Sequence, residues 1–238
     1  MTGCTRAARW VWGVLLGTWL LAACGGGASG GAVAPTPQQV AAPLEPVRVL
    51  YSQASPLLLP YWVAIERELF ARNGLQVELR EERDAAAAYQ RLASGEVAVY
   101  LAPLSGALLE QGAGADAIVL LGGSPDLAIV ANRQLAAIRQ PILERFLRAT
   151  LEGIALVKTQ PEAARALLAQ RLGPTAAQQS EPIVRARLLD AAPVPYLDPA
   201  EVAAALPTAD AETAERLVDS SILKRLEASG FVAALYRA

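Results

Sequence analysis

Residues 47–102 read VRVLYSQASPLLLPYWVAIERELFARNGLQVELREERDAAAAYQRLASGEVAVYLA, and this stretch decides the fold. Three of its segments alternate apolar and polar residues or are continuously apolar, which predicts strands at 47–52, 75–80 and 97–102. Helical spacing between them predicts helices at 59–72 and 85–93. Asn73-Gly74 is a stop signal for the first helix, and Asp84 is placed to cap the second. The alternation of strands and helices predicts an α/β fold with parallel pairing.

Two further apolar runs, at residues 117–121 and 127–131, follow a short helix predicted at 104–111. The sequence Gly-Gly-Ser-Pro-Asp at 122–126 separates the two runs and is typical of a hairpin connection. We therefore expect a mainly parallel sheet whose last strand is antiparallel and lies at or near one side.

From about residue 138 onward the chain is predicted to be helical. Residues 142–158 carry a clear apolar stripe at the 3.6-residue helical period, whereas the helix at 176–189 is weaker because Pro182 interrupts it. The other helices predicted in this half cover residues 161–171, 200–206, 211–218 and 221–236.

Composition excludes several classes of function. The chain has 238 residues, no histidine, two cysteines and a formal net charge of −2. Without a basic excess it cannot neutralise a phosphate backbone, so nucleic acid is not expected as a partner. Without histidine it has no Ser–His or Cys–His nucleophile pair and no histidine metal site. We therefore expect a protein that is not an enzyme and has no cofactor or bound metal.

The first 24 residues have the order of an export signal. Arg6 and Arg9 form a basic head before the apolar run 10–23, which is shorter than the about 20 residues needed to span a bilayer. The run ends in Leu-Ala-Ala-Cys at 21–24, which resembles the lipobox of bacterial lipoproteins, where the cysteine is acylated. The alternatives are an ordinary secretory signal with a chance cysteine, or a short membrane anchor.

These patterns divide the chain into three parts. Residues 1–23 are expected to be a lipoprotein signal peptide, and lipidation at Cys24 would hold the protein on the membrane in an extracytoplasmic part of the cell envelope. Residues 24–46, rich in glycine, alanine and proline, are expected to be a flexible tether. Residues 47–238 form the folded domain, with a sheet-bearing part at 47–133 and a helical part at 138–238.

Within the domain, four segments resemble the first lobe of periplasmic solute-binding proteins of the nitrate/sulfonate/taurine and thiamine-precursor type. They are VLYSQASPLLLPYWVAIERELFARNGLQVEL, LASGEVAVYLAPLSGAL, AIVLLGG and SPDLAIVANR. Two later segments, ILERFLRATLEGIALVKTQPEAARALLAQRLG and LVDSSILKRLEASGF, resemble the helices with which that family returns to its first lobe. The resemblance implies an α/β fold: a single Rossmann-like lobe of a type II periplasmic-binding-protein fold with a helical C-terminal half. It also implies a small-molecule solute and an ABC permease as partners.

The sequence departs from this family in two places. In the family a second α/β lobe follows the segment equivalent to 127–133, but here only residues 134–139 separate that segment from the returning helix. Six residues cannot contain a βαβ unit, so the second lobe is expected to be missing and a monomer is expected to bind solute weakly. Ala98 also stands where the family favours aspartate. The thiamine-precursor enzymes need histidine and a cysteine-rich motif, so their activity is not expected.

A candidate ligand site follows from the rule that open parallel sheets bind ligands beyond the carboxyl ends of their strands. The rule selects the loops 52–60, 81–84 and 103–105. They carry hydroxyl and amide groups, a cation and helix N-termini that hold anions, while Tyr61, Trp62 and Tyr100 offer an apolar wall. The alternative is that serine and glutamine form turns, Arg83 is a solvated charge and the aromatic residues are core. The candidate site residues are Ser52, Gln53, Ser55, Tyr61, Trp62, Arg83, Asp84, Pro103 and Ser105.

These features favour a lipid-anchored substrate-binding or accessory component of an ABC importer for a small organic anion such as a sulfonate. The alternative is a lipoprotein with a degenerate solute-binding fold that acts as a protein-interaction or sensory module. A missing lobe is also expected to leave an apolar strip exposed, through which the domain dimerises or binds a protein. Otherwise the helix at 142–158 folds over the strip and leaves a monomer. The strip comprises Leu127, Ile129, Val130, Leu135 and Ile138.

Overall fold

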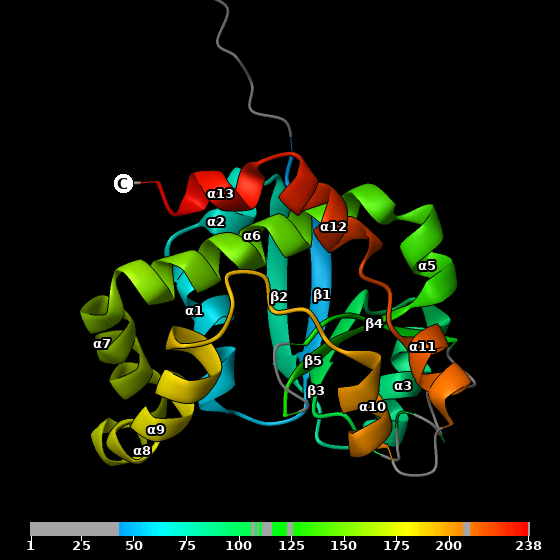
Figure 1. The fold of residues 1–238 in the computed structure, drawn as a ribbon, viewed down its shortest axis with the longest axis horizontal. Coiled ribbons are helices and arrows are strands. Elements are labelled where there is room, and N and C mark those ends of the chain that lie inside the picture. The colour runs from blue at the N-terminus through cyan, green and yellow to red at the C-terminus, as the bar shows by residue number, and fades with distance from the viewer. Residues whose placement is uncertain are drawn as a thin grey trace, which may run out of the picture. The chain divides into compact units, whose positions relative to one another are not determined.

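A mixed five-stranded sheet organises the fold, in the order β2-β1-β3-β5-β4 (Figure 1). β1 pairs in parallel with both β2 and β3, and β5 is antiparallel to both β3 and β4. The expected antiparallel last strand is therefore confirmed, one position from the edge. The strands are β1 (Glu45–Tyr51), β2 (Leu75–Glu81), β3 (Val99–Ala102), β4 (Ala117–Leu121) and β5 (Ala128–Asn132).

The computed structural model describes residues 43–105, 108, 110, 116–122, 126–206 and 210–237. The expected signal peptide, Cys24 and most of the expected tether lie outside the described residues, as do four of the eight residues of the helix expected at 104–111. Because β1 begins at Glu45, the sheet-bearing part starts two residues earlier than the boundary drawn from the sequence.

Helices cover both faces of the sheet, and alternate residues of a strand reach different hydrophobic clusters. Val49 and Ile129 pack in one cluster with α1 (Leu59–Glu66) and α6 (Gln140–Thr159). Leu50 and Val130 pack in the other, with residues of three further helices. These are α3 (Ala85–Ser94), α10 (Pro199–Ala205) and α11 (Ala211–Leu217). Every residue of β3, β4 and β5 is buried, as expected for strands covered on both faces.

The pair α1 and α6 forms the tightest part of the first cluster. A Cβ on Gly153 of α6 would lie 2.3 Å from the backbone oxygen of Pro60, so only glycine fits at this crossing. Phe146 is fully buried and stacks on Phe70, with ring centroids 5.2 Å apart. The single helix expected at 59–72 divides into α1 and α2 (Leu69–Arg72), because Glu68 between them has a φ of 53°.

The short link after β5 is itself helical, which the sequence analysis missed. Residues 133–138 form α5 (Arg133–Ile138), and the side chain of Asn132 caps it by accepting a hydrogen bond from the backbone N–H of Leu135 at 2.9 Å. α6 follows directly. Among the described residues there is one sheet and no second α/β lobe between β5 and α6.

The expected exposed strip is wrong for most of its residues. Leu127, Ile129 and Val130 are buried and Leu135 is half-buried, because helices cover both faces of the sheet; only Ile138 stands out, 72% exposed. The outer edge of β4 is also covered, since Val218 pairs with Val119 and the Asp219 N–H donates to the Val119 carbonyl at 2.9 Å. The interface inferred from that strip therefore loses its basis.

The C-terminal half consists of short helices around α6 (Figure 1). The interrupted helix expected at 176–189 is three segments, the last of them a π-helix, and the one expected at 221–236 breaks at Gly230, whose φ is 76°. None of the helices in the described residues is both long and apolar enough to cross a membrane. The remaining elements are η1 (Pro56–Leu58), α7 (Pro161–Leu172), α8 (Pro174–Gln179), α9 (Glu181–Val184), η2 (Arg185–Leu189), α12 (Ser221–Ala228) and α13 (Phe231–Leu235).

Candidate functional site

A polar pocket lies at the carboxyl ends of β1 and β3, where the strand-edge rule places a ligand. Its volume is about 300 Å³, and Ser52 and Gln53 from the loop after β1 form one side. Arg83 and the buried ring of Tyr100 form another. Five of the candidate residues meet here: Ser52, Gln53, Arg83, Pro103 and Ser105.

A second, larger pocket of about 550 Å³, which we call the open pocket, adjoins the first, because Ser52, Gln53 and Pro103 line both. We call the two pockets together the strand-edge hollow. Ser55 lines the open pocket on the β1 side. The opposite side comes from Asp126, Leu127 and from the far C-terminal half, through Pro182, Ile183, Ala186 and Arg187. Figure 1 shows α9 beside the segment that follows β1.

Two of the helix N-termini offered as anion sites are already capped by the chain's own side chains. The Asp84 carboxylate accepts hydrogen bonds from the backbone N–H groups of Ala86 and Ala87, at 2.9 and 3.2 Å, and so caps α3. The Ser55 hydroxyl accepts from the N–H of Leu57 at 3.3 Å at the start of η1. Asp84 and Ser55 therefore have local structural roles, and Asp84 adds negative charge near the polar pocket.

Charges at the polar pocket are balanced by pairing. Arg83, whose side chain is 81% exposed, forms an ion pair with Glu81 at 2.6 Å. Glu82 pairs with Arg91 at 3.2 Å. Burial, followed by the charges of Glu82 and Asp84, raises the pKa of Tyr100, so its hydroxyl stays protonated and able to donate.

Tyr61 and Trp62 do not line the strand-edge hollow. Both belong to α1 and are buried in the first hydrophobic cluster, with exposures of 4% and 8%. Burial also raises the pKa of the Tyr61 hydroxyl. The alternative interpretation of these two aromatic residues as core fits their position, while Tyr100 does reach the hollow.

The C-terminal half contributes residues to the hollow that were not expected from the sequence. Arg187, in the π-helix η2, lies 3.4 Å from the carboxylate of Asp126. It also lines a small apolar cavity of about 40 Å³ that continues inward between Leu57, Leu127 and Leu188. No local pattern marks Arg187, because its place beside β1 depends on how the interrupted helical segment returns to the sheet.

A metal site does not appear in the described part of the chain, where no three His, Cys, Asp or Glu side chains are grouped closely enough to hold an ion. The hollow instead offers hydroxyl groups, one amide, two paired arginines and apolar surface from proline, alanine and isoleucine. Such a lining suits reversible binding of a small polar molecule.

Comparison with known proteins identifies the fold. A solved structure of a protein from Bordetella bronchiseptica RB50 aligns with 77% of this chain and 97% of its own, at 11% identity and a TM-score of 0.58. The crystal structure of the periplasmic aliphatic sulphonate binding protein SsuA from Escherichia coli aligns with 79% of this chain and 94% of its own, at 13% identity and a TM-score of 0.51. The chain has the type II periplasmic-binding-protein fold. No family model and no curated protein matches the sequence.

The periplasmic-binding-protein fold here takes the form of a single Rossmann-like lobe with a helical C-terminal half, as expected from the sequence. The segment formed by α9 and η2, which we call the α9–η2 wall, bounds the open pocket opposite the loop after β1. One side of the hollow is thus built on the sheet and the other on the C-terminal half of the chain.

Proposed function

We propose that the protein is an extracytoplasmic solute-binding component, or an accessory component, of an ABC importer. The observation that carries this proposal is the strand-edge hollow, which two distant parts of the chain line together. The fold supports it, because structures similar to this one include a protein named as a periplasmic aliphatic sulphonate binding protein.

The proposed solute is a small organic anion, such as a sulfonate. Arg187 supplies the guanidinium, whose fork of donors suits sulfonate or carboxylate oxygens, and Ser52 and Gln53 supply further polar contacts. Asp126 holds Arg187 in the structure, so an incoming anion would compete with that carboxylate. Apolar lining from Pro182 and Ile183 suits a short carbon chain next to the anionic group.

Binding by the monomer is proposed to be weak. The hollow is open to water, with Gln53, Pro103 and Ile183 all exposed around it. A ligand that stays partly exposed to water gains less binding free energy than one buried between two closing lobes. We therefore expect a dissociation constant above about 1 µM. A partner such as the permease would complete the enclosure.

Calorimetry on residues 41–238, which form one compact unit, tests the binding proposal. We expect butanesulfonate to bind, and Arg187→Gln to weaken binding by about tenfold or more, because a charge-assisted hydrogen bond is lost. The matched control is Arg185→Gln, since Arg185 is exposed in the same helix but lines no pocket described here. Equal effects of both substitutions, or no binding of aliphatic sulfonates or carboxylates, would contradict the proposal.

The proposed lipid anchor at Cys24 rests on the sequence pattern at residues 1–24. Cys24→Ser should abolish labelling by a fatty-acid probe and should release the protein or leave the precursor uncleaved, whereas Cys4→Ser should change neither. A wild-type protein that takes up no acyl label, and a mutant retained on the membrane as before, would exclude the anchor.

A second candidate function is a protein-interaction or sensory module with a degenerate solute-binding fold. Both arginines that line the hollow already have carboxylate partners, Glu81 for Arg83 and Asp126 for Arg187, which favours this candidate. The calorimetry distinguishes the two, because a degenerate site would bind none of the anions tested.

A further inference from the structure

The α9–η2 wall has little apolar packing of its own. Of its nine residues, four in α9 and five in η2, only Val184 is buried. Yet four of its residues, at positions 182, 183, 186 and 187, line the open pocket. η2 is a π-helix, with the Asp190 N–H donating to the Arg185 carbonyl at 2.8 Å; π-helical turns are rare and occur often at functional sites. Leu188 and Leu189 are half-buried against the first hydrophobic cluster, so apolar packing holds three of the nine residues and leaves room for polar contacts to fix the ends.

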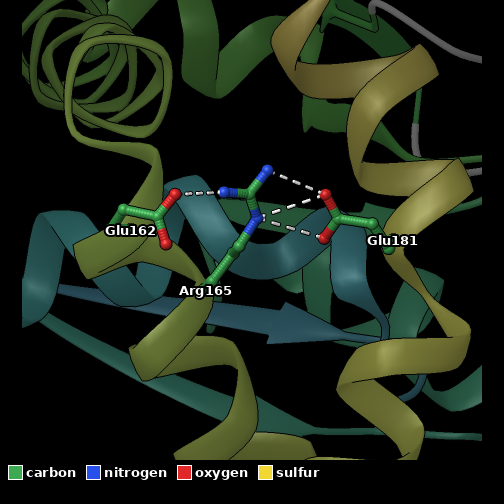
Figure 2. A network of polar contacts seen from close by, with 3 residues as sticks. All are labelled: Glu162, Arg165 and Glu181. Carbon is green, nitrogen blue, oxygen red and sulfur yellow. Dashed lines mark hydrogen bonds and ion pairs between the residues drawn. The ribbon is translucent and has the colours of Figure 1, made fainter.

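A polar contact holds the N-terminal end of the wall (Figure 2). Arg165 of α7 points at Glu181, the first residue of α9, and donates from both Nε and Nη2, with distances of 2.9 to 3.3 Å. Glu162 contacts the same guanidinium from the other side, but it lies within α7. Arg165 is only 34% exposed, and the hydrogen bonds that it donates to the Glu181 carboxylate raise its pKa. The Arg165–Glu181 pair thus ties α9 to α7.

A second polar contact holds the C-terminal end. Lys158 of α6 donates from Nζ to the carbonyl of Leu189, the last residue of η2, at 2.7 Å, and also to the carbonyl of Ala191. The last carbonyls of a helix have no partner within the helix, and the ammonium donates to that of Leu189 and to that of Ala191, two residues further on. Burial lowers the pKa of Lys158, opposed by the charge of Asp190. Lys158 thus ties the end of the wall to the longest helix of the core.

We propose that Arg165 and Lys158 are positioning residues of the strand-edge hollow, one fixing each end of the α9–η2 wall so that Arg187 faces the loop after β1. Neither residue lines the hollow. As a statement about ligand binding the inference rests on the proposed function, but the positioning of the wall is measurable without a ligand.

Hydrogen exchange of the full chain, purified in detergent, tests the positioning. We expect Arg165→Met and Lys158→Met each to speed exchange of the amides at 183–191 about tenfold, because each removes charge-assisted hydrogen bonds at one end of a thinly packed segment. The amides of β1 and β3 should exchange as in the wild type. Acceleration throughout the chain would mean that the two residues merely stabilise the fold, and no acceleration at 183–191 would overturn the proposal.

Two variants serve as matched controls. Glu162→Gln removes the other carboxylate on Arg165 while leaving the contact to Glu181, so exchange at 183–191 should stay within about twofold of the wild type. Lys158→Arg keeps a cation that donates to both carbonyls and should largely restore the slow exchange. If Glu162→Gln acts like Arg165→Met, or Lys158→Arg like Lys158→Met, the assigned contacts are wrong.

A ligand arm separates this inference from the proposed function. With butanesulfonate as the probe, Lys158→Met alone should weaken binding several-fold. Added to Arg187→Gln, the same substitution should weaken binding no further, because Lys158 acts through Arg187. Equal effects in both backgrounds would overturn the role in binding. If the probe fails to bind the wild type, the proposed function fails for sulfonates, and the exchange measurement still decides whether the wall is positioned by these residues.

Discussion

α6 and the α9–η2 wall are both helical, but they are held by different forces. α6 has 20 residues and buries eleven of them, including Phe146 and Ile154. The wall has nine residues and buries only Val184. A helix that buries much apolar surface, such as α6, unfolds only together with the core. End contacts such as Arg165–Glu181 stabilise only the segment to which they belong.

The difference shows how a single lobe can combine a rigid side with an adjustable one. Ser52 and Gln53 follow a strand in the middle of the sheet, so their positions are fixed by the core. Arg187 belongs to a segment with thin packing, so its position depends on a few polar contacts. We expect mutations on the two sides to differ in whether they unfold the protein or only loosen the hollow.

The largest effect is expected for Phe146→Ala in α6. Phe146 is fully buried between Phe70 and Tyr61, and removing its ring should lower the free energy of unfolding by about 3–5 kcal/mol. Urea denaturation followed by circular dichroism measures this. Phe231→Ala is the control, because Phe231 is only half-buried beneath Arg148 and should cost less. If Phe146→Ala lowers the free energy of unfolding by less than about 1 kcal/mol, Phe146 is not a central residue of the core.

An intermediate effect is expected when the same substitution, valine to alanine, is made in α6 and in the α9–η2 wall. Val157 of α6 and Val184 of α9 are 1% and 2% exposed. Val157→Ala should lower the global free energy of unfolding by about 2 kcal/mol. Val184→Ala should lower it less and should instead speed hydrogen exchange at 181–191, because the wall can open alone. Equal global losses, with no local change in exchange, would show that the wall is part of the core.

The smallest effect is expected at the cap of α3. Asp84→Ala removes the acceptor for the N–H groups of Ala86 and Ala87 and should cost about 1 kcal/mol, measured by thermal unfolding. Asp84→Asn keeps an acceptor and should cost a few tenths of that. If Asp84→Ala and Asp84→Asn are equally stable, Asp84 does not cap α3, and it would again be a candidate ligand-binding residue.

Much of the fold was predictable because its signals are local. The apolar alternation of β1 and β2 and the continuous apolar runs of β4 and β5 gave the strands, and Asp84 was identified as a cap from its place before a helical pattern. Asn132 carries the same kind of signal, so the helix α5 that follows it could have been predicted from the sequence. The break at Glu68 was not readable, because a glutamate with positive φ leaves no mark in the sequence.

The sheet side of the hollow was predictable and the wall was not. Ser52, Gln53 and Pro103 follow strands, and the strand-edge rule needs only the order of the elements. Arg187 lies 135 positions after Ser52, and its arrival at the same place depends on the packing of α7, α8 and α9, which no local pattern specifies. Tyr61 and Trp62 lie in α1, where every residue from 59 to 64 is buried, as is typical of a core helix. Tyr61 still reaches the small apolar cavity that Arg187 also lines.

Chemical-shift mapping by NMR tests most directly whether the two sides form one binding site. Residues 41–238 would be titrated with butanesulfonate while the backbone amides of Ser52, Gln53, Ser105, Ala186 and Arg187 are followed. We predict that the amides on both sides shift together and saturate with one dissociation constant, because both line the same hollow. Shifts confined to one side, or centred away from the hollow, would contradict the account.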